Sequence, residues 1–239
     1  MQSDGCGASA PFTDKDIAKY VVDSVFARYS DWKHTALEKR LPQDWSIRKK
    51  KDVEVALVEA PDKVAFFQRR IQQSAKVTPA TTAAQRMDGL RVRRVVRVEN
   101  KQLFEDYQRE REKLRKKLES TQVGVERLEE HAPAWLKAKA GLAEIVIDPD
   151  CNEFRLWHGT SATVSEILAQ HGFDERVGGD TNGGLYGQGS YFADASSKAN
   201  QYSTAPFCKA PTNIDGQHCM LSCRVLMGDP NMAKKYIGR

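Results

Sequence analysis

The sequence predicts an α+β protein, because two kinds of hydrophobic pattern occur in separate segments of the chain. In the first kind, apolar residues recur every three or four positions, as they do on one face of a helix. In the second kind, β-branched and aromatic residues gather in short runs, which is typical of strands. Hydrophobic residues make up 40% of the 239 residues, which is enough to build a core and excludes a wholly disordered chain.

The first third of the chain carries weaker patterns of both kinds. Residues 13–25 start with a threonine and an aspartate three positions apart, which suits a helix start, and continue with apolar residues at helical spacing. Residues 53–58 predict a strand, and a helix is expected from Pro61 to about residue 71. Residues 74–89 hold a proline, three threonines and small residues, and we interpret them as a linker. We therefore expect residues 1–88 to form an N-terminal region of unknown role.

Stronger patterns follow the expected linker. Valines among arginines predict a strand over residues 92–98, and a leucine and tyrosine stripe predicts a helix over residues 101–119. Short strands are expected at residues 144–147 and at residues 154–157. The last of these strands runs directly into His158, so this histidine is expected at the end of a buried strand.

A second group of elements is expected after that strand. Residues 164–171 have helical spacing, and Gly172 is well placed to cap the helix at its C-terminal end. A strand is expected at residues 190–193, a short helix at residues 196–202 and a late core strand at residues 220–226.

Charge, hydropathy and cysteine content limit the class of protein. Lysine and arginine number 37 against 32 acidic residues, a net charge of +5, which allows an anionic ligand but demands none. The basic stretches 48–51 and 109–117 are interpreted as solvated charged faces, so nucleic acid is not indicated as a partner. No apolar run reaches the roughly 18 residues that a membrane span needs, and no secretory signal opens the chain. Five scattered cysteines fit a reducing compartment, so we expect a cytoplasmic or nuclear location.

Several familiar site motifs are excluded. The glycines between residues 178 and 189 are not followed by the lysine and hydroxyl residue of a phosphate-binding loop, and Phe192 stands where a dinucleotide-binding fingerprint needs its third glycine. A zinc site is the alternative for four potential ligands near the C-terminus. We favour no metal, because one of these cysteines lies in the apolar strand over residues 220–226. The four are Cys208, His218, Cys219 and Cys223.

An ordered set of motifs remains: His158-Gly159-Thr160 after a strand, then Gly189-Ser190-Tyr191-Phe192-Ala193, then the segment 196–202 with the sequence Ser-Ser-Lys-Ala-Asn-Gln-Tyr. In this order and spacing the set closely resembles the catalytic domain of the poly(ADP-ribose) polymerase family, the diphtheria-toxin-like ADP-ribosyltransferases. Residues 172–176 and 196–202 look like tankyrases, and residues 95–113 look like the mono-ADP-ribosylating members. The resemblance covers about residues 90–239, which we expect to form the catalytic domain.

The resemblance implies a split antiparallel sheet with NAD between its halves. It implies that His158 and Tyr191 are catalytic, that His158 bonds the adenosine ribose and that the backbone of Gly159 holds the nicotinamide carboxamide. Thr160 is implied near the adenosine, Tyr191 is the second signature residue, and Tyr202 is the aromatic that stacks on the nicotinamide. Such a stack fixes the plane of the leaving group and contributes about 0.5 to 1.5 kcal/mol beyond burial.

Two departures from the family pattern stand out. Ala199 occupies the place where the family usually carries a serine that bonds the nicotinamide carboxamide. The family's third signature residue, a glutamate on a later strand, has no counterpart before Arg239. We therefore expect the catalytic domain to be incomplete at its C-terminal end, with its last strands missing.

The implied function is an NAD-dependent protein ADP-ribosyltransferase, which transfers ADP-ribose from NAD to protein side chains and releases nicotinamide. NAD enters as a substrate and no metal is required. The partners are then NAD and protein acceptors, with automodification as one outcome, and no membrane. Two alternatives remain open: a catalytically inactive module that binds NAD or serves as a scaffold, and an RNA 2′-phosphotransferase, which shares the fold.

Overall fold

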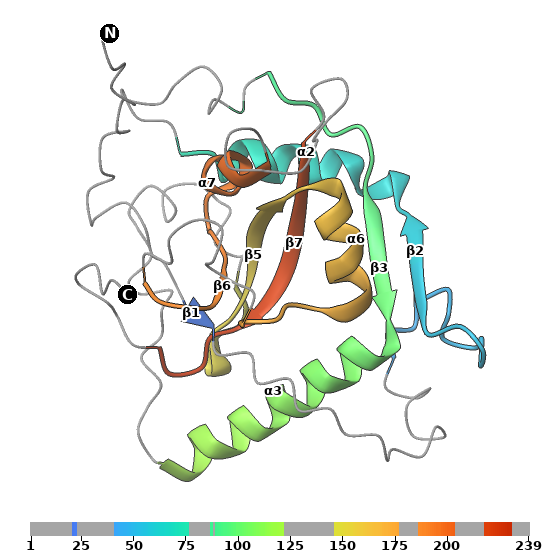
Figure 1. The fold of residues 1–239 in the computed structure, drawn as a ribbon. Coiled ribbons are helices and arrows are strands. Elements are labelled where there is room, and N and C mark those ends of the chain that lie inside the picture. The colour runs from blue at the N-terminus through green and yellow to red at the C-terminus, as the bar shows by residue number, and fades with distance from the viewer. Residues whose placement is uncertain are drawn as a thin grey trace, which may run out of the picture.

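The computed structural model describes residues 21–22, 41–76, 87, 89–121, 146–176, 186–203 and 218–230. Its helices and its antiparallel strand pairs confirm an α+β protein (Figure 1). The helices are α2 (Val64–Gln73), α3 (Lys101–Thr121), α6 (Ala162–His171) and α7 (Ser196–Asn200), with short 3-10 turns η1 (Pro61–Lys63), η4 (Pro149–Cys151) and η5 (Gln201–Ser203). The strands are β1 (Val21–Val22), β2 (Val55–Glu59), β3 (Val96–Asn100), β4 (Val146–Asp148), β5 (Glu153–Thr160), β6 (Ser190–Tyr191) and β7 (Cys219–Leu226).

The centre of the described structure is the antiparallel sheet β4-β5-β7. All eight residues of β5 pair with β7, from Glu153 opposite Leu226 to Thr160 opposite Cys219. Leu156 and Trp157 are almost completely buried, so the middle of β5 lies in the core. The backbone of Trp157 also exchanges two hydrogen bonds, of 2.7 and 2.8 Å, with Ala193. This bridge places the segment after β6 beside β5.

A second antiparallel pair, β2-β3, lies at the side of the molecule away from β6 (Figure 1). The expected strand over residues 92–98 is shorter than predicted, since β3 begins only at Val96. The reason is a long-range contact: the Val92 amide donates to the side chain of Gln68 on α2, at 2.7 Å, and is thereby directed away from a strand partner. Helix α3 follows β3 without a loop.

Helix α2 and the residues after it are bonded to the later part of the chain. The Arg70 guanidinium donates to the backbone oxygen of Arg155 at 2.5 Å and lies 5.0 Å from the centre of the Trp157 indole ring. The indole nitrogen of Trp157 donates to the Ser74 hydroxyl at 3.0 Å. The Ser197 hydroxyl on α7 accepts from the Lys76 amide at 2.9 Å. Residues 74–76, which the sequence assigned to a linker, therefore contact both β5 and α7.

A buried ionic cluster fastens α3 to the start of β5. The fully buried Glu153 carboxylate accepts from the Tyr107 hydroxyl at 3.0 Å and from Arg224 on β7 at 2.6 Å. Arg111 on α3 donates to Asp148 at 2.6 Å. Burial opposes ionisation of Asp148, but the bond from Arg111 keeps the pKa of this carboxyl below its ordinary value. The cluster thus joins four elements through charges that neutralise one another.

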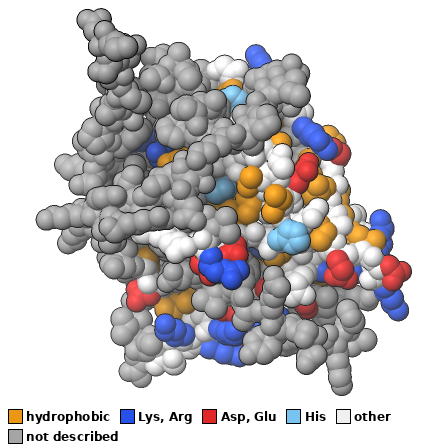
Figure 2. Space-filling model, viewed as in Figure 1, with side chains coloured by type: hydrophobic (Ala, Val, Ile, Leu, Met, Phe, Trp, Pro, Cys, Tyr) orange, Lys and Arg blue, Asp and Glu red, His pale blue; other side chains and the backbone are white. Residues whose placement is uncertain are grey.

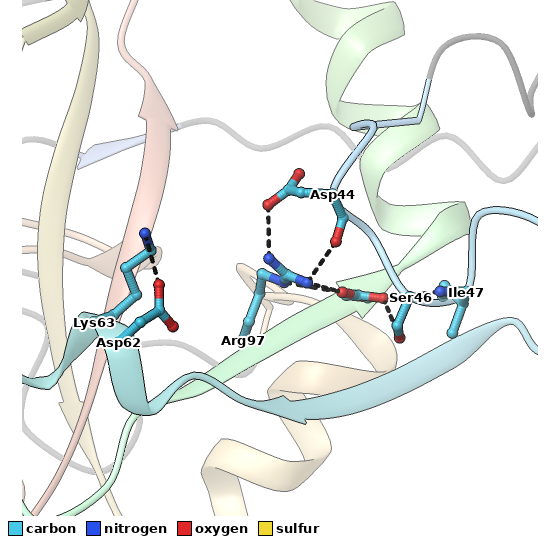
Figure 3. Close-up of polar contacts among 7 residues, drawn as sticks. Asp44, Ser46, Ile47, Asp62, Lys63 and Arg97 are labelled. Carbon is cyan, nitrogen blue, oxygen red and sulfur yellow. Dashed lines mark hydrogen bonds and ion pairs between the residues drawn. The ribbon is translucent and has the colours of Figure 1, made fainter.

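A second cluster holds the segment before β2 against β3 (Figure 3). Arg97 donates to Asp44 at 2.7 Å and to the buried Glu99 carboxylate, which also accepts from the Ser46 hydroxyl at 2.8 Å and the Ile47 amide at 3.1 Å. The pKa of Glu99 lies below its ordinary value, because the hydrogen bonds from these donors outweigh the opposing effect of burial.

Most of the expected elements after residue 90 are confirmed, with changed bounds. The expected helix over residues 13–25 lies outside the described residues except for Val21 and Val22, which form a strand opposite Tyr191 and Ser190 instead of a helical turn. The expected helix over residues 196–202 divides into α7 and η5. Among the described residues, none of the helices combines the length and the apolar character that crossing a membrane requires.

Candidate active site

The structure brings the three sequence motifs together around one end of β5. His158 lies on β5, Tyr191 on β6 and Tyr202 in η5. The Nδ1 atom of His158 lies 2.9 Å from the backbone oxygen of Tyr191. Burial, and after it the proximity of Tyr191, raises the pKa of the Tyr202 phenol. Tyr191 therefore lies beside His158 and close to Tyr202, and η5 packs against β5.

The ring of His158 has a defined protonation state. A backbone oxygen can only accept, so Nδ1 carries the hydrogen and Nε2 keeps a free lone pair in the neutral ring. Burial lowers the pKa of His158, and the bond to the Tyr191 oxygen opposes this shift only in part. The imidazole is therefore neutral at pH 7, with Nε2 as a hydrogen-bond acceptor for a hydroxyl group.

Two phenylalanines enclose this ring. The ring of Phe173, which follows helix α6, meets His158 edge to face, with centroids 4.9 Å apart and planes at 83°. Phe192 lies 5.7 Å from His158 and 4.8 Å from Phe173. Neither phenylalanine was assigned a role from the sequence. The one sequence signal that could have identified them is that each directly follows a residue already singled out, Gly172 or Tyr191.

Gly159 is required by the packing of the protein itself. A Cβ atom at this position would lie 1.7 Å from the backbone oxygen of Ala199 on α7 and 2.6 Å from its carbonyl carbon. Glycine is therefore what allows α7 to approach β5. The resemblance implied that this glycine lets a ligand amide approach the backbone, and the structure adds this second cause. Thr160 ends β5, half-buried, opposite Cys219.

The hydroxyl of Tyr191 is used within the protein. It donates to the backbone oxygen of Gly187 and accepts from the Tyr186 amide at 3.2 Å. Gly187 has φ of +96°, a conformation that glycine adopts easily, so the hydroxyl holds a tight turn before β6. Tyr191 thus binds His158 through its backbone oxygen and fixes the preceding turn through its hydroxyl.

Tyr202 lies beside a lysine. The ammonium group of Lys198 is 5.2 Å from the centre of the Tyr202 ring and 3.1 Å from the Gln201 side-chain oxygen. Burial lowers the pKa of Lys198. Ala199, the residue in place of the family's serine, is buried at the point where α7 meets Gly159.

The zinc alternative finds no support in the described residues. The Nδ1 atom of His218 is 2.6 Å from the Asn200 side-chain oxygen, which ties this histidine to α7. Among the described residues, the ligand atoms of His218, Cys219 and Cys223 do not all come within 4.8 Å of one another. Cys208 lies outside the described residues.

One cluster of possible metal ligands was not predicted. The ligand atoms of Asp148, Cys151 and Glu153 lie within 4.8 Å of one another. However, Arg111 pairs with both Asp148 and Glu153, and Arg224 pairs with Glu153. Burial also raises the pKa of the Cys151 thiol to about 11. These acidic groups serve as ion-pair partners in the cluster that holds α3.

Comparison with known proteins gives one family. Residues 68–237 match the model of the poly(ADP-ribose) polymerase catalytic domain. The protein mono-ADP-ribosyltransferase PARP11 of Mus musculus is 30% identical over 152 residues, which are 63% of this chain and 35% of that protein. The human PARP11 is 33% identical over 124 residues, or 52% of this chain and 26% of that protein. The PARP12 of Mus musculus is 40% identical over 80 residues, 34% of this chain and 10% of that protein. The matched segments thus span about a tenth to a third of the length of these relatives.

Proposed function

Since this chain belongs to the poly(ADP-ribose) polymerase family, we propose that it binds NAD, transfers the ADP-ribose part to protein side chains and releases nicotinamide. The observation that carries this proposal is the neutral His158 ring, in which Nδ1 donates to the Tyr191 oxygen and Nε2 has no hydrogen-bond partner among the described residues. Such a ring can accept a hydrogen bond from a ribose hydroxyl without adding positive charge to the site.

The proposed reaction breaks the bond between the nicotinamide nitrogen and C1′ of its ribose. The electron pair of that bond leaves with nicotinamide, and the ribose carbon passes through an oxocarbenium-like state. A side chain of the acceptor protein then forms the new bond to C1′ and loses its proton to solvent. Because the leaving group must be held in one orientation, the residues that fix nicotinamide contribute to the rate by positioning.

Each predicted site residue receives a role in this proposal. His158 binds the adenosine ribose, the Gly159 backbone binds the nicotinamide carboxamide and Thr160 lies near the adenosine. The Tyr202 ring stacks on nicotinamide, and Tyr191 orients His158. The proposal includes an ADP-ribosyltransferase fold, in which NAD lies between two parts of the sheet. It also includes NAD as the substrate and no metal.

We propose transfer of a single ADP-ribose unit, because the matched relatives are named as mono-ADP-ribosyltransferases. Protein acceptors, including the chain itself, are proposed as partners, and nucleic acid is not. A cytoplasmic or nuclear location is also proposed. It is supported by the scattered cysteines, of which Cys151, Cys219 and Cys223 are unpaired in the described part of the chain.

One observation favours the second candidate, an inactive NAD-binding module. Ala199 lacks the hydroxyl that the family's serine offers to nicotinamide, and loss of one hydrogen bond costs about 0.5 to 1.5 kcal/mol. This corresponds to roughly 2- to 13-fold weaker binding. Binding is thus expected to be weakened and still measurable.

Three measurements on the full chain test these candidates. NAD binding is measured by calorimetry, nicotinamide release by chromatography and transfer by following labelled ADP-ribose into protein. Binding with release and transfer agrees with the transferase, whereas binding without release favours the inactive module. Absence of NAD binding contradicts both, and processing of a 2′-phosphorylated RNA supports the phosphotransferase.

A matched pair of variants links the result to the site. His158→Gln keeps a polar side chain but loses the imidazole acceptor, and we expect NAD binding to weaken by about 2- to 13-fold. The control is His171→Gln, because His171 ends α6 and is exposed. Equal NAD affinities for the two variants would contradict the role assigned to His158.

A further inference from the structure

The rings of His158, Phe173 and Phe192 form a cluster of three mutual contacts, with centroid distances between 4.8 and 5.7 Å. Phe173 makes the most nearly perpendicular of these contacts, at 83° to the imidazole. An edge-to-face arrangement of this kind is the attractive geometry for two rings, because the positive edge of one meets the negative face of the other.

The hydrogen bond to Tyr191 does not fix the imidazole by itself. Among the described residues, the His158 ring makes one polar contact, the hydrogen bond that Nδ1 donates to the Tyr191 backbone oxygen. This bond restrains Nδ1, but small changes of the two side-chain torsions can still tilt the ring while the bond is kept. A second ring packed against the imidazole removes this freedom, and with it fixes the direction of Nε2.

The sequence places Phe173 at this position through the end of α6. The Gly172 amide donates to the Leu168 oxygen at 2.9 Å and closes the last turn of the helix. Gly172 has φ of +78°, a conformation that residues with a side chain rarely adopt. Phe173 follows at once, and its half-buried ring reaches the imidazole on β5.

We infer that Phe173 is a positioning residue, whose ring holds the His158 imidazole so that Nε2 is directed at the adenosine ribose of NAD. This inference rests on the proposed function. Phe173 acts through His158 and needs no contact with NAD.

The test compares Phe173→Leu with a matched control, Phe66→Leu. Phe66 on α2 is also half-buried and also makes an edge-to-face pair, with Phe67, at 5.1 Å and 88°, but it has no contact with His158 among the described ring pairs. Phe173→Leu loses the ring contacts with His158 and Phe192, Phe66→Leu loses the contact with Phe67, and both variants keep an apolar side chain. Phe173→Tyr, which keeps the aromatic ring, serves as the conservative variant.

We expect Phe173→Leu to weaken NAD binding by about 2- to 13-fold, the range that corresponds to one aromatic pair. Phe173→Tyr should stay within about twofold of the wild type, and Phe66→Leu should bind NAD normally. Nuclear magnetic resonance of the imidazole gives an independent readout. In Phe173→Leu the pKa of His158 should rise toward its ordinary value, since the ring becomes less buried, and in Phe66→Leu it should not move.

The outcomes separate the inference from the proposed function. If the wild type binds NAD and Phe173→Leu binds it equally well with an unchanged His158 spectrum, the inference is wrong and the proposed function stands. If the wild type binds no NAD, the proposed function fails and the inference fails with it. If Phe173→Leu does not fold, Phe173→Tyr decides: loss of NAD binding in this folded variant overturns positioning by the ring alone.

Discussion

Replacing Gly159 by alanine should separate α7 from β5. The added Cβ would lie 1.7 Å from the Ala199 oxygen, whereas real Cβ atoms essentially never approach closer than 3.0 Å, so the two backbones must move apart by about 1.3 Å. Neither partner is a flexible side chain that could turn away. Forcing extra atoms into such packing costs about 1 to 3 kcal/mol. For a chain of this size that corresponds to a fall in Tm of about 2 to 12 °C.

The same displacement should affect NAD binding more than stability. Gly159 follows His158 directly, and Tyr202 follows α7 closely, so the movement changes the distance between two residues of the candidate site. A misplacement of about 1 Å can reduce the rate of an enzyme by about a hundredfold. We therefore expect Gly159→Ala to lose most of its nicotinamide release or, if the wild type only binds, most of its NAD affinity.

A glycine elsewhere gives the control. Gly89 has nothing within 4 Å of the place where a Cβ would be added, so Gly89→Ala should keep the wild-type Tm and NAD affinity. Tm is measured by differential scanning calorimetry and affinity by isothermal titration. If Gly159→Ala has the same Tm and the same NAD affinity as Gly89→Ala, then Ala199 does not lie against Gly159 and the packing argument is refuted.

Three further predictions concern the same fold. Ala199→Ser should strengthen nicotinamide binding by about 2- to 13-fold in a calorimetric titration, because it adds the hydroxyl that the family pattern contains, and weaker binding would contradict that assignment. Glu153→Gln should lower the free energy of unfolding by about 1.5 to 3 kcal/mol in urea, because the fully buried carboxylate accepts charge-assisted hydrogen bonds from half-exposed arginines that a neutral amide cannot replace. The exposed pair of Glu112 is the control, and Glu112→Gln should cost about 1 kcal/mol or less. Burial raises the pKa of Asp194 from its ordinary 3.8 to about 6, so the folded protein holds this proton more tightly and loses stability as the pH rises through that interval. Asp194→Asn should lack this loss, and the difference in Tm between the variant and the wild type should grow from pH 4 to pH 6; a constant difference would show that Asp194 titrates normally.

Local signals predicted the elements that depend on local interactions. Helix α6 was expected from its spacing and from Gly172, and the structure shows both the Gly172 cap and the Ser161 hydroxyl, which accepts from the Val164 amide at 3.1 Å. The start of β3 was wrong because it depends on Gln68, 24 residues earlier, whose side chain binds the Val92 amide. No pattern around residue 92 carries that information.

The candidate site divides in the same way. The sequence named His158, Tyr191 and Tyr202 through their resemblance to a family, and the structure places them together. Their individual roles toward NAD remain predictions. The packing of Phe173 on His158 depends on how the chain returns after α6, and the close approach of Ala199 to Gly159 joins residues 40 positions apart. Neither contact can be inferred from composition or periodicity.

The site is sensitive to changes on β5 because four closely spaced residues of this strand contact different parts of the fold. The backbone of Arg155 binds α2, Trp157 bridges to the segment after β6, His158 binds β6 and Gly159 receives α7. A change that moves this backbone therefore disturbs stability and ligand geometry together. A change at Tyr202, which lies beyond α7, alters the ring that faces nicotinamide in our proposal and leaves these four contacts in place. Substitutions on β5 should consequently lower Tm and NAD affinity in parallel, whereas substitutions at Tyr202, which loses its contact with Lys198 and local packing, should lower NAD affinity more than Tm.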